Sequence, residues 1–495
     1  MMQAMLSRRQ LLSGLVAAGL SPSAFAWGQD EFRTTAAELK PFRGLDGRDL
    51  QADTVAVEGR WPAALTGRYF RNGPGLLQRG GRHYEHWFDG DGLVQSWTIA
   101  PGGRISHRAR FVQTEKFRAE QAAGRFLLPA FGTAVPAQRP VRHADSVNVA
   151  NTSVLLQGEH LYALWEGGSA HELDPATLET RGVKVWSEDL RGMPFSAHPK
   201  VEPDGTVWNF GTAGGRLALY QLSAQGQVLR HGLLDVQAPP MLHDFAVSQR
   251  YLVFLMAPIT LDRAALPGGA AMLAAMRWQA AQPTRVLVVD KADFSRWQML
   301  EMPAANVFHF GNAWDEGGHL RVDYVQGVPL PEFNGAISQL MQGRRPERDV
   351  STPRVLDIDL ARGRLALTAR DEAVEFPVVD PRVVAQRHRF VWYPTALDTR
   401  GRWGFNGLMR LDIESGARER FSYGDDVVVE EHVLVPRPGS RGEGEGWLLG
   451  MGYDIRRERS FLDVFDAQAL AAGPVARAWL PYAVPYGFHG RFYAA

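Results

Sequence analysis

The sequence contains no cysteine in 495 residues. This absence excludes disulfides, thiolate metal sites, iron–sulfur clusters and cysteine nucleophiles together. A tight metal site in this chain must therefore use histidine or carboxylate side chains. The sequence has 14 histidines, so nitrogen ligands are available.

The chain also lacks an excess of charge of either sign. Lys and Arg total 54, and Asp and Glu total 54, so the formal net charge is zero. We therefore expect no nucleic-acid partner. No Pro/Ser-rich linker, low-complexity block or charged tail divides the sequence, and nothing in it requires a protein partner. These features predict one large domain, since closed all-β folds can exceed the usual domain size.

After the N-terminal segment, no stretch of the sequence approaches the roughly 20 consecutive apolar residues that a membrane-spanning helix needs. The N-terminus itself has the order of a twin-arginine export signal: Arg8-Arg9, a weakly apolar run at residues 13–20, and a small-residue cleavage site at Ala24-Phe25-Ala26. The alternative is a disordered start with two chance arginines. We predict that residues 1–26 are a signal peptide, that residues 27–495 are the mature domain, and that the protein is periplasmic.

Short runs of β-branched and aromatic residues alternate with Gly, Pro, Asp and Asn turns along most of the chain. This pattern is typical of an antiparallel all-β protein with tight hairpins. Typical runs are Val154-Leu155-Leu156, residues 161–165, residues 206–210, residues 252–255 and residues 286–289. Two segments break the pattern, residues 117–124 and Leu266 to Gln279, and the apolar content of the second predicts a short helix.

Several phrases share one plan, in which a strand is followed by an Asp and a turn: HELDPATLET, VLDIDLARGR, LMRLDIESGAR and LDVFDAQAL. They are typical of the outer strands of repeated sheets. Seven four-stranded blades would each take about 67 residues of the mature chain.

Four histidines lie in short apolar or glycine-bordered segments. They are His198, His243, His309 and His489. The gaps between them are 45, 66 and 180 residues, close to one, one and three blades, so ligands from separate blades would all face the central axis. Four neutral imidazoles can hold one divalent metal, and imidazole suits Zn, Cu, Ni and Fe alike. The alternative is that each histidine is an ordinary structural residue of its strand.

A family resemblance joins these motifs. The strings GRYFRNGPG, HWFDGDGLV, NVANTSV, ALWEGG, SAHPKVEPDG, LHDFAV, VFHFGNAWDEGG, VEFPVVDP and YGFHGRF occur in order from about residue 55 to residue 493 and resemble the carotenoid cleavage oxygenases. The resemblance implies a seven-bladed β-propeller, with short helices and loops capping the metal-bearing face. It implies non-haem Fe(II) on the axis, held by His198, His243, His309 and His489.

The resemblance also assigns the residues around the metal. In the family, three glutamates lie behind the histidine ligands, and they correspond here to Glu166, Glu375 and Glu431. Glu430 is adjacent to the last of these, and His432 stands where the family commonly has proline. Carboxylates in such positions can accept the distal N–H of a ligand and compensate the metal charge. Thr152 resembles the threonine that lies over a vacant iron position and limits access to it.

The implied reaction is oxidative cleavage of a carbon–carbon double bond by O₂, giving two carbonyl fragments. Residues expected to line the substrate tunnel are Phe111, Trp165, Phe308 and Phe488. Because neighbours in a strand point to opposite faces, some of these must instead belong to the core. The segment Leu266 to Trp278 is expected either to pack on the propeller or to dip into a membrane, as an apolar patch does in carotenoid-cleaving relatives.

Substrate choice within the family stays open between polyenes and aryl alkenes. Carotenoids and apocarotenoids are one class, and lignin-derived stilbenes and phenylpropenes are another. Stilbene-cleaving relatives bind a 4-hydroxyl through a tyrosine and a lysine. Here the tyrosine position corresponds to Phe111, and the segment before NVANTSV offers Arg142 and His143 in place of a lysine, which favours a polyene. A carrier that binds a carotenoid without cleaving it is a further alternative.

Overall fold

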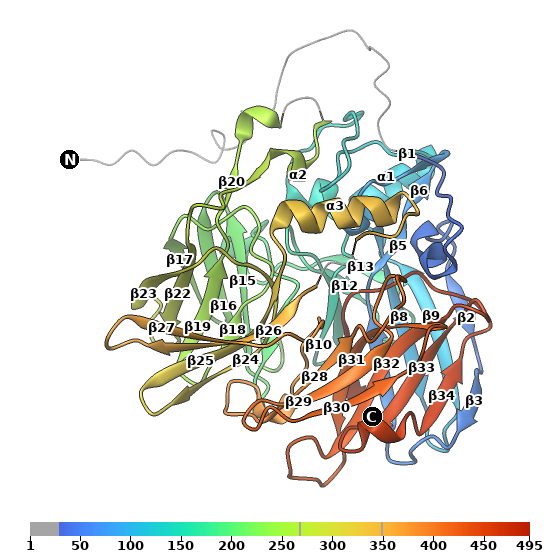
Figure 1. Cartoon of the computed structure of the whole chain (residues 1–495). Helices are drawn as coiled ribbons and strands as arrows, with labels where there is room; N and C mark the ends of the chain where they lie inside the picture. The colour runs from blue at the N-terminus through green and yellow to red at the C-terminus, as the bar shows by residue number, and fades with distance from the viewer. Residues whose placement is uncertain (1–28, 267–268, 348–349) are drawn as a thin grey trace.

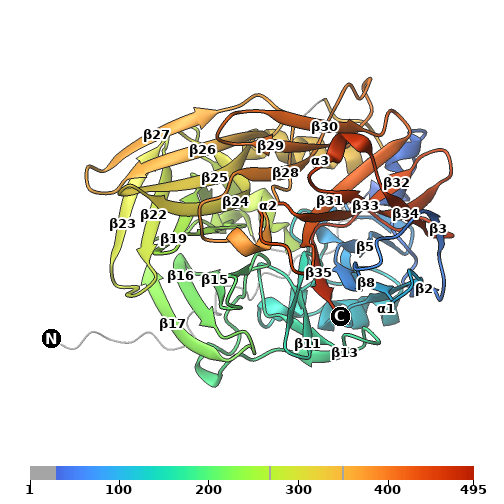
Figure 2. The same cartoon turned by 90° about the horizontal axis from the view of Figure 1, so that it is seen from below.

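Seven antiparallel sheets surround a common axis in the computed structural model, which describes residues 29–266, 269–347 and 350–495. Figure 1 shows the ring from the side, and Figure 2 shows it turned by 90°. The seven-bladed β-propeller predicted from the sequence is confirmed. The predicted export signal at residues 1–26 lies outside the described residues.

The first four blades, with strands given from the innermost outward, follow the chain in order. Blade 1 consists of β35 (Gly490–Ala494), β4 (Gly67–Arg71), β8 (Asp91–Ile99), β9 (Ile105–Phe111) and β2 (Leu50–Ala52). Blade 2 consists of β10 (Ser153–Gln157), β11 (His160–Leu164), β12 (His171–Leu173) and β13 (Thr180–Val183). Blade 3 consists of β14 (Lys200–Val201), β15 (Val207–Ala213), β16 (Arg216–Leu222) and β17 (Val228–Asp235). Blade 4 consists of β18 (Ala246–Val247), β19 (Tyr251–Met256), β22 (Thr284–Asp290) and β23 (Trp297–Met302).

The last three blades return to the start of the chain. Blade 5 consists of β24 (Asn306–Glu316), β25 (His319–Gly327), β26 (Thr352–Asp359) and β27 (Arg364–Ala369). Blade 6 consists of β28 (Phe390–Thr395), β29 (Gly407–Asp412) and β30 (Arg418–Ser422). Blade 7 consists of β31 (Val427–Pro436), β32 (Gly446–Asp454), β33 (Arg459–Asp466), β34 (Ala476–Trp479) and β3 (Ala56–Gly59).

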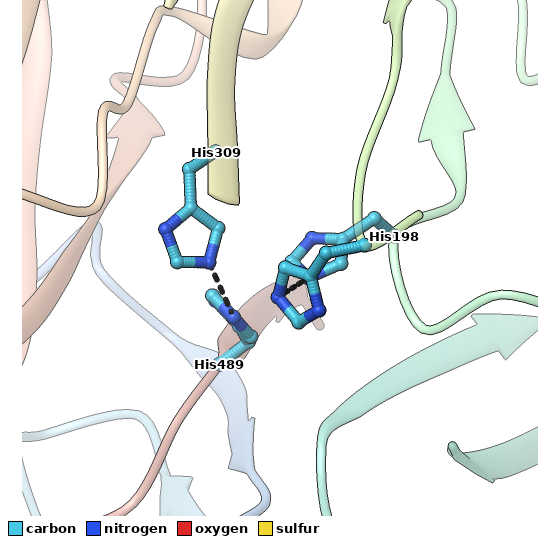
Figure 3. A group of neighbouring side chains, drawn as sticks. His198, His309 and His489 are labelled. Carbon is cyan, nitrogen blue, oxygen red and sulfur yellow. Dashed lines mark hydrogen bonds between the residues drawn. The ribbon is translucent and has the colours of Figure 1, made fainter. Parts of the chain in front are cut away.

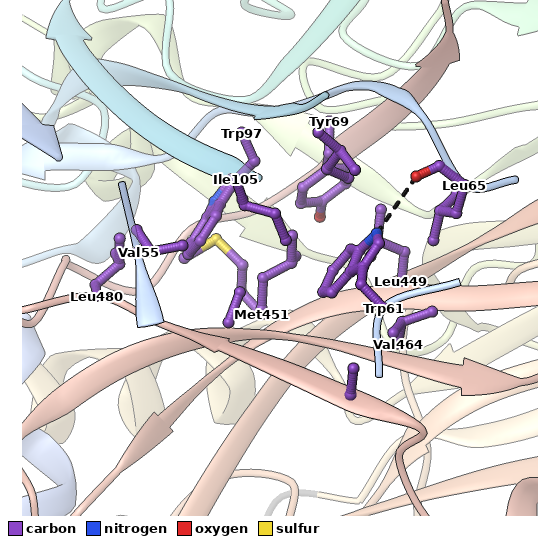
Figure 4. Close-up of a cluster of buried hydrophobic side chains, with 14 of the residues drawn as sticks. Val55, Trp61, Leu65, Tyr69, Trp97, Ile105, Leu449, Met451, Val464 and Leu480 are labelled. Carbon is purple, nitrogen blue, oxygen red and sulfur yellow. Dashed lines mark hydrogen bonds between the residues drawn. The ribbon is translucent and has the colours of Figure 1, made fainter. Parts of the chain in front are cut away.

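The ring is closed by strands from both ends of the described chain. The C-terminal strand β35 pairs with β4 in blade 1, and β3, from the N-terminal part of the described chain, pairs with β34 in blade 7. Between these two blades lies a large apolar cluster that includes Trp61, Trp97 and Met451 (Figure 4). The indole N–H of Trp61 donates to the carbonyl of Leu65 at 3.3 Å, so this buried polar group is paired. Closure therefore rests on both strand pairing and apolar burial.

The repeated strand–Asp–turn phrases join the outer strands of blades. Asp174 accepts the backbone N–H groups of Ala176 and Thr177 at 2.9 and 2.8 Å, between β12 and β13. Asp412 makes the corresponding pair of bonds between β29 and β30. These Asp side chains satisfy turn amides that would otherwise lack a partner.

Short elements and loops cover the face above the axis (Figure 1). They include α2 (Met272–Ala275), α3 (Leu330–Met341), the turn η4 (Ala144–Val147) and the ribbon of β20 (Ile259–Leu261) with β21 (Met276–Trp278). The short helix predicted over Leu266 to Gln279 is confirmed only at α2, because in the described part of this segment the next three residues pair with β20 as a strand. The α3 helix was not predicted.

Smaller elements complete the described fold. The remaining strands are β1 (Gln29–Asp30), β5 (Pro74–Leu76), β6 (Gln78–Arg79) and β7 (Arg82–His83). The helix α1 (Glu115–Ala123) follows β9. The short 3-10 helices are η2 (Ala37–Arg43), η3 (Trp87–Asp89), η5 (Glu188–Leu190), η6 (Arg263–Ala265), η8 (Pro381–Val383) and η9 (Leu470–Ala472). Within the described ranges, no helix has the length and apolar character needed to cross a membrane.

Candidate metal centre

The four predicted histidines converge on one point. One ring nitrogen from each of His198, His243, His309 and His489 lies within 4.8 Å of the others. The Nε2 atoms of His198 and His243 are 2.9 Å apart, and those of His309 and His489 are 3.2 Å apart (Figure 3). Each histidine stands before or within the innermost strand of its blade, in blades 3, 4, 5 and 1. The spacing of one, one and three blades read from the sequence is therefore present in the fold.

Three of the imidazoles are oriented by carboxylates. The Nδ1–H groups of His243, His309 and His489 donate to Glu166, Glu375 and Glu431 at 2.6, 2.6 and 2.9 Å. A proton held on Nδ1 leaves the lone pair of Nε2 free and aimed at the common point. This donor set suits a divalent cation, because four neutral nitrogens face inward and three anions lie directly behind them.

The two adjacent glutamates of β31 have different partners. Glu431 accepts from His489 and from the backbone N–H of Gly490 at 2.7 Å, whereas Glu430 pairs with the buried Arg71 at 3.0 Å. Strand pairing shifts register between Val429 and His432, which marks a β-bulge. The bulge explains how two consecutive carboxylates both reach partners near the axis.

A second bulge, in β24, directs two adjacent residues of that strand toward the site. Pairing shifts register between Val307 and Phe310, and both Phe308 and His309 line the cavity beside the histidine cluster. The strict alternation expected of a strand therefore does not hold at these residues. The Phe308 ring lies 5.2 Å from the ring of His243.

Burial and charge shift the pKa values of these groups in opposite directions. Burial lowers the pKa of His198 well below its ordinary value, and the neighbouring imidazoles add to that effect. Burial is the largest effect on His309 and acts to lower its pKa, but the charge and hydrogen bond of Glu375, together with the charges of Asp244 and Glu431, leave that pKa raised. For Glu431, burial acts to raise the pKa, but His489 and the bonds it accepts leave it lowered. Glu431 is thus held as an anion, as a cation site needs.

Thr152 lies at the start of blade 2, beside the same cavity. Its hydroxyl donates to Asn151 at 3.1 Å, and its carbonyl accepts the backbone N–H of His489 at 3.2 Å. The nearby Ala150 has a left-handed φ of 46°, which is unusual for a residue with a side chain. Side chains of Asn148 and Asn72 bond its backbone N–H and carbonyl and hold this conformation.

A cavity of about 1610 Å³ opens on one side of the histidine cluster. Of the predicted tunnel residues, Trp165, Phe308 and Phe488 line it. Phe111 is not among its lining residues; it is buried in the core of blade 1, with its ring 5.3 Å from that of Phe117. Aromatic lining residues that the sequence reasoning missed are Trp87, Phe88, Phe131, Phe333, Phe376, Trp403 and Phe405.

Phe376 shows why such residues are hard to find from sequence. It has a left-handed φ of 51°, its ring lies 5.1 Å from that of His309, and its backbone N–H donates to Glu375 at 2.6 Å. The string VEFPVV places it beside Glu375, which was the one available signal. Its orientation depends on a backbone conformation that the sequence pattern does not reveal.

Fold and site define the class: a seven-bladed propeller with a four-histidine metal site at its axis. The model of the retinal pigment epithelial membrane protein family matches residues 47–494. The chain therefore belongs to this family, the carotenoid cleavage oxygenases, and is an oxygenase.

Named relatives agree with this assignment. The chain is 31% identical to apocarotenoid-15,15'-oxygenase of Synechocystis over 88% of this chain and 91% of the relative. It is 30% identical to isoeugenol monooxygenase of Pseudomonas putida over 88% of this chain and 93% of the relative. The crystal structure of cobalt-substituted Synechocystis apocarotenoid oxygenase superposes with a TM-score of 0.82 at 28% identity, covering 94% of this chain and all of that one.

Proposed function

We propose that this protein holds Fe(II) on His198, His243, His309 and His489 and cleaves a carbon–carbon double bond of a carotenoid or apocarotenoid with O₂. The observation that carries the proposal is the convergence of four imidazoles, three of which, those of His243, His309 and His489, line a large, mostly apolar cavity. Bound iron would supply the activation of O₂. In the overall reaction the double bond breaks, each carbon receives one oxygen atom of O₂, and two carbonyl groups form. The alkene supplies all four electrons, so no external reductant is needed.

The residues of the chain bind and orient the reactants. Glu166, Glu375 and Glu431 keep the imidazoles in the tautomer that presents Nε2. The aromatic walls exclude water and hold an elongated apolar substrate with one bond beside the histidine cluster, so position sets which bond is cut. Thr152 limits access to the metal from the blade 2 side.

The composition of the cavity supports a polyene. Among the described residues that line it there is no tyrosine and no lysine, although Arg142 and His143 are present. The pair of groups that would bind a 4-hydroxystilbene is therefore missing from the wall. Because Phe111 lies in the core, its lack of a hydroxyl no longer bears on this choice.

A second candidate is cleavage of an aryl alkene, that is, a lignin-derived stilbene or a phenylpropene, by the same chemistry. The 30% identity to isoeugenol monooxygenase favours it. Mass analysis of products from a panel of carotenoids, apocarotenals, hydroxystilbenes and phenylpropenes separates the two. Cleavage of polyenes supports the first proposal, whereas activity on aryl alkenes alone establishes the second.

The remaining alternative is a carrier that binds a carotenoid without cleaving it. Aerobic incubation of iron-loaded protein with an apocarotenal tests this. Loss of the long-wavelength polyene absorbance together with shorter aldehyde products supports the enzyme. Unchanged spectra under saturating binding would establish the carrier.

We also propose contact with a membrane through the segment Leu266 to Trp278. Met272 is 40% exposed, Leu273 is half-buried and Arg277 is exposed, whereas Met276 is buried and lines the cavity. An exposed apolar residue beside a cationic one suits a membrane surface. Co-sedimentation with vesicles should weaken in Met272→Glu and persist in the outer-strand control Leu229→Glu; equal binding of both variants would remove the proposal.

Export by the twin-arginine pathway into the periplasm completes the proposal. The paired Arg8-Arg9 and the small-residue site before Trp27 support it. Replacement of both arginines by lysine should leave the protein in the cytoplasm. Unchanged periplasmic yield from that variant would contradict the assignment.

A further inference from the structure

The fourth imidazole of the cluster lacks the direct carboxylate partner that the other three have. The carboxylate facing Nδ1 of His198 belongs to Asp244, and its Oδ1 lies 3.9 Å away, too far for a hydrogen bond. The other three Nδ1 atoms are within 2.9 Å of a glutamate oxygen. The site is therefore asymmetric at His198.

Asp244 is held away from His198 by other partners. Its side chain is only 1% exposed, and Lys200 lies 2.8 Å from Oδ1 and 3.0 Å from Oδ2. The backbone N–H groups of Phe245 and Phe310 donate to it at 2.7 and 2.9 Å. These partners follow His198, His243 and His309 closely in the chain, so one ion pair links three ligand-bearing segments.

The pair also lies apart from the substrate cavity. Asp244 and Lys200 line a second cavity of about 560 Å³ beside the cluster, as does His198. Neither is among the residues that line the larger cavity. Any effect of this pair on the metal must therefore pass through the ligand-bearing segments, of which His198 has the facing imidazole, rather than through contact with the substrate.

We infer that Asp244 is the fourth carboxylate of the metal site and that Lys200 restrains it, so that His198 is the most weakly polarised of the four ligands. A carboxylate that accepts the distal N–H of a histidine makes that ligand a stronger donor. Lys200 offsets the charge of Asp244 and occupies its oxygens. Asp244 and Lys200 are thus positioning residues with opposite effects on the same imidazole. The inference rests on the iron centre proposed above.

Two substitutions in the iron-loaded full chain test the inference, because they should act in opposite directions. Asp244→Asn removes the anion and leaves Lys200 unbalanced, so ferrous iron should pass to an excess of chelator about 10-fold faster, and the Fe(III)/Fe(II) potential should rise. Lys200→Gln frees Asp244 to accept from His198, so transfer should slow and the potential should fall. Lys200→Arg keeps the cation and should behave as wild type.

Reference variants separate this role from a structural one. Glu375→Gln removes a direct carboxylate partner of His309. It should lower the iron affinity 10- to 100-fold, the usual range for such substitutions. Asp463→Asn disrupts the ion pair between the buried Asp463 of β33 and Arg477 of β34. This pair lies away from the ligands, so the substitution should leave iron release unchanged. If Asp244→Asn fails to fold, the two lysine variants decide alone: Lys200→Gln should release iron more slowly and at a lower potential than wild type, whereas Lys200→Arg should match wild type.

Two outcomes would overturn the inference while leaving the proposed function intact. One is an Asp244→Asn protein with the iron release rate and potential of wild type. The other is a shift of the potential in the same direction for Asp244→Asn and Lys200→Gln. A wild-type chain that binds no iron would instead refute the proposed function itself.

Discussion

His309 illustrates how a single residue is aimed at the site. A bulge in β24 turns it toward the axis, Glu375 fixes its Nδ1–H, and its Nε2 lies 3.2 Å from that of His489. Removal of one of four nitrogen ligands should weaken the metal site strongly. We predict that His309→Ala loses at least 10-fold in both iron affinity and turnover, measured by iron analysis after dialysis and by polyene cleavage.

The control for that variant lies on the next strand. His319 is half-exposed and pairs with Asp357, away from the cluster, so His319→Ala should retain iron and activity. Full iron content and full turnover in His309→Ala would show that the ligand assignment is wrong.

Asp89 carries a prediction about pH. The residue is buried and accepts hydrogen bonds from Gly132 and Thr133, and burial raises its pKa from 3.8 to about 6. Between these values the folded chain holds a proton that the unfolded chain releases. The free energy of unfolding should therefore fall as pH rises from about 4 to about 6.

Asp89→Asn removes this titration. Relative to wild type, the metal-free variant should gain about 2 to 3 kcal/mol in the free energy of unfolding between pH 4 and pH 7, measured by urea unfolding. A difference between the two proteins that does not change with pH would contradict the assignment of the raised pKa to Asp89.

At the residue scale, the sequence identified side chains whose neighbours form specific strings. The four histidines and Glu166 and Glu375 meet as expected from those strings. Glu431, assigned through the resemblance, accepts from His489 as expected, but the bulge that gives the adjacent Glu430 a different partner has no signal in the pattern. Asp244 stands in the string LHDFAV but was not singled out, since its role depends on Lys200 from another blade.

At the scale of elements, the C-terminal strand β35 links closure of the ring to the site. It pairs with β4 over Gly490–Ala494 and immediately follows His489. The Tyr493 hydroxyl also accepts the backbone N–H of Leu156 at 2.7 Å, which joins blade 1 to blade 2. The strand therefore holds both the fold and one metal ligand in place.

Deletion of residues 491–495 should lower the thermal midpoint and reduce iron content, because β4 loses its partner and His489 loses its support. Circular dichroism melting and iron analysis measure the two effects. Deletion of Ala495 alone is the matched control and should change neither. A shortened chain with the wild-type midpoint and iron content would contradict this role of β35.

Elements were predicted well where local pattern decides and poorly where tertiary contacts decide. Residues 154–156, 252–255 and 286–289 form strands as expected from their β-branched and aromatic content. Met276–Trp278 became a strand because it pairs with β20, a contact that its helix-like composition does not reveal. The missed helix α3 buries Leu330, Ile337, Leu340 and Met341 against the covering loops, and its interior Gly335 weakens the helical signal.

At the scale of the whole molecule, the metal site joins blades 1, 3, 4 and 5. A cation bound to one ligand from each blade binds the folded ring and not the dispersed ligands of the unfolded chain. Iron at 100 times its dissociation constant should therefore stabilise the fold by about 2.7 kcal/mol. Calorimetry of metal-free and iron-loaded protein measures the gain.

The same measurement on His309→Ala provides the comparison. That variant should gain much less from iron, because its affinity is lower. Equal stabilisation of wild type and variant would indicate that iron binds elsewhere on the chain.

The central claim is that one iron ion is held at the point where the four imidazoles converge. Anomalous diffraction at the iron absorption edge, from crystals of the iron-loaded protein, tests it most directly. We predict a single strong peak per chain, within bonding distance of Nε2 of His198, His243, His309 and His489. A peak at another place, or no peak in crystals whose iron content is confirmed, would contradict the account.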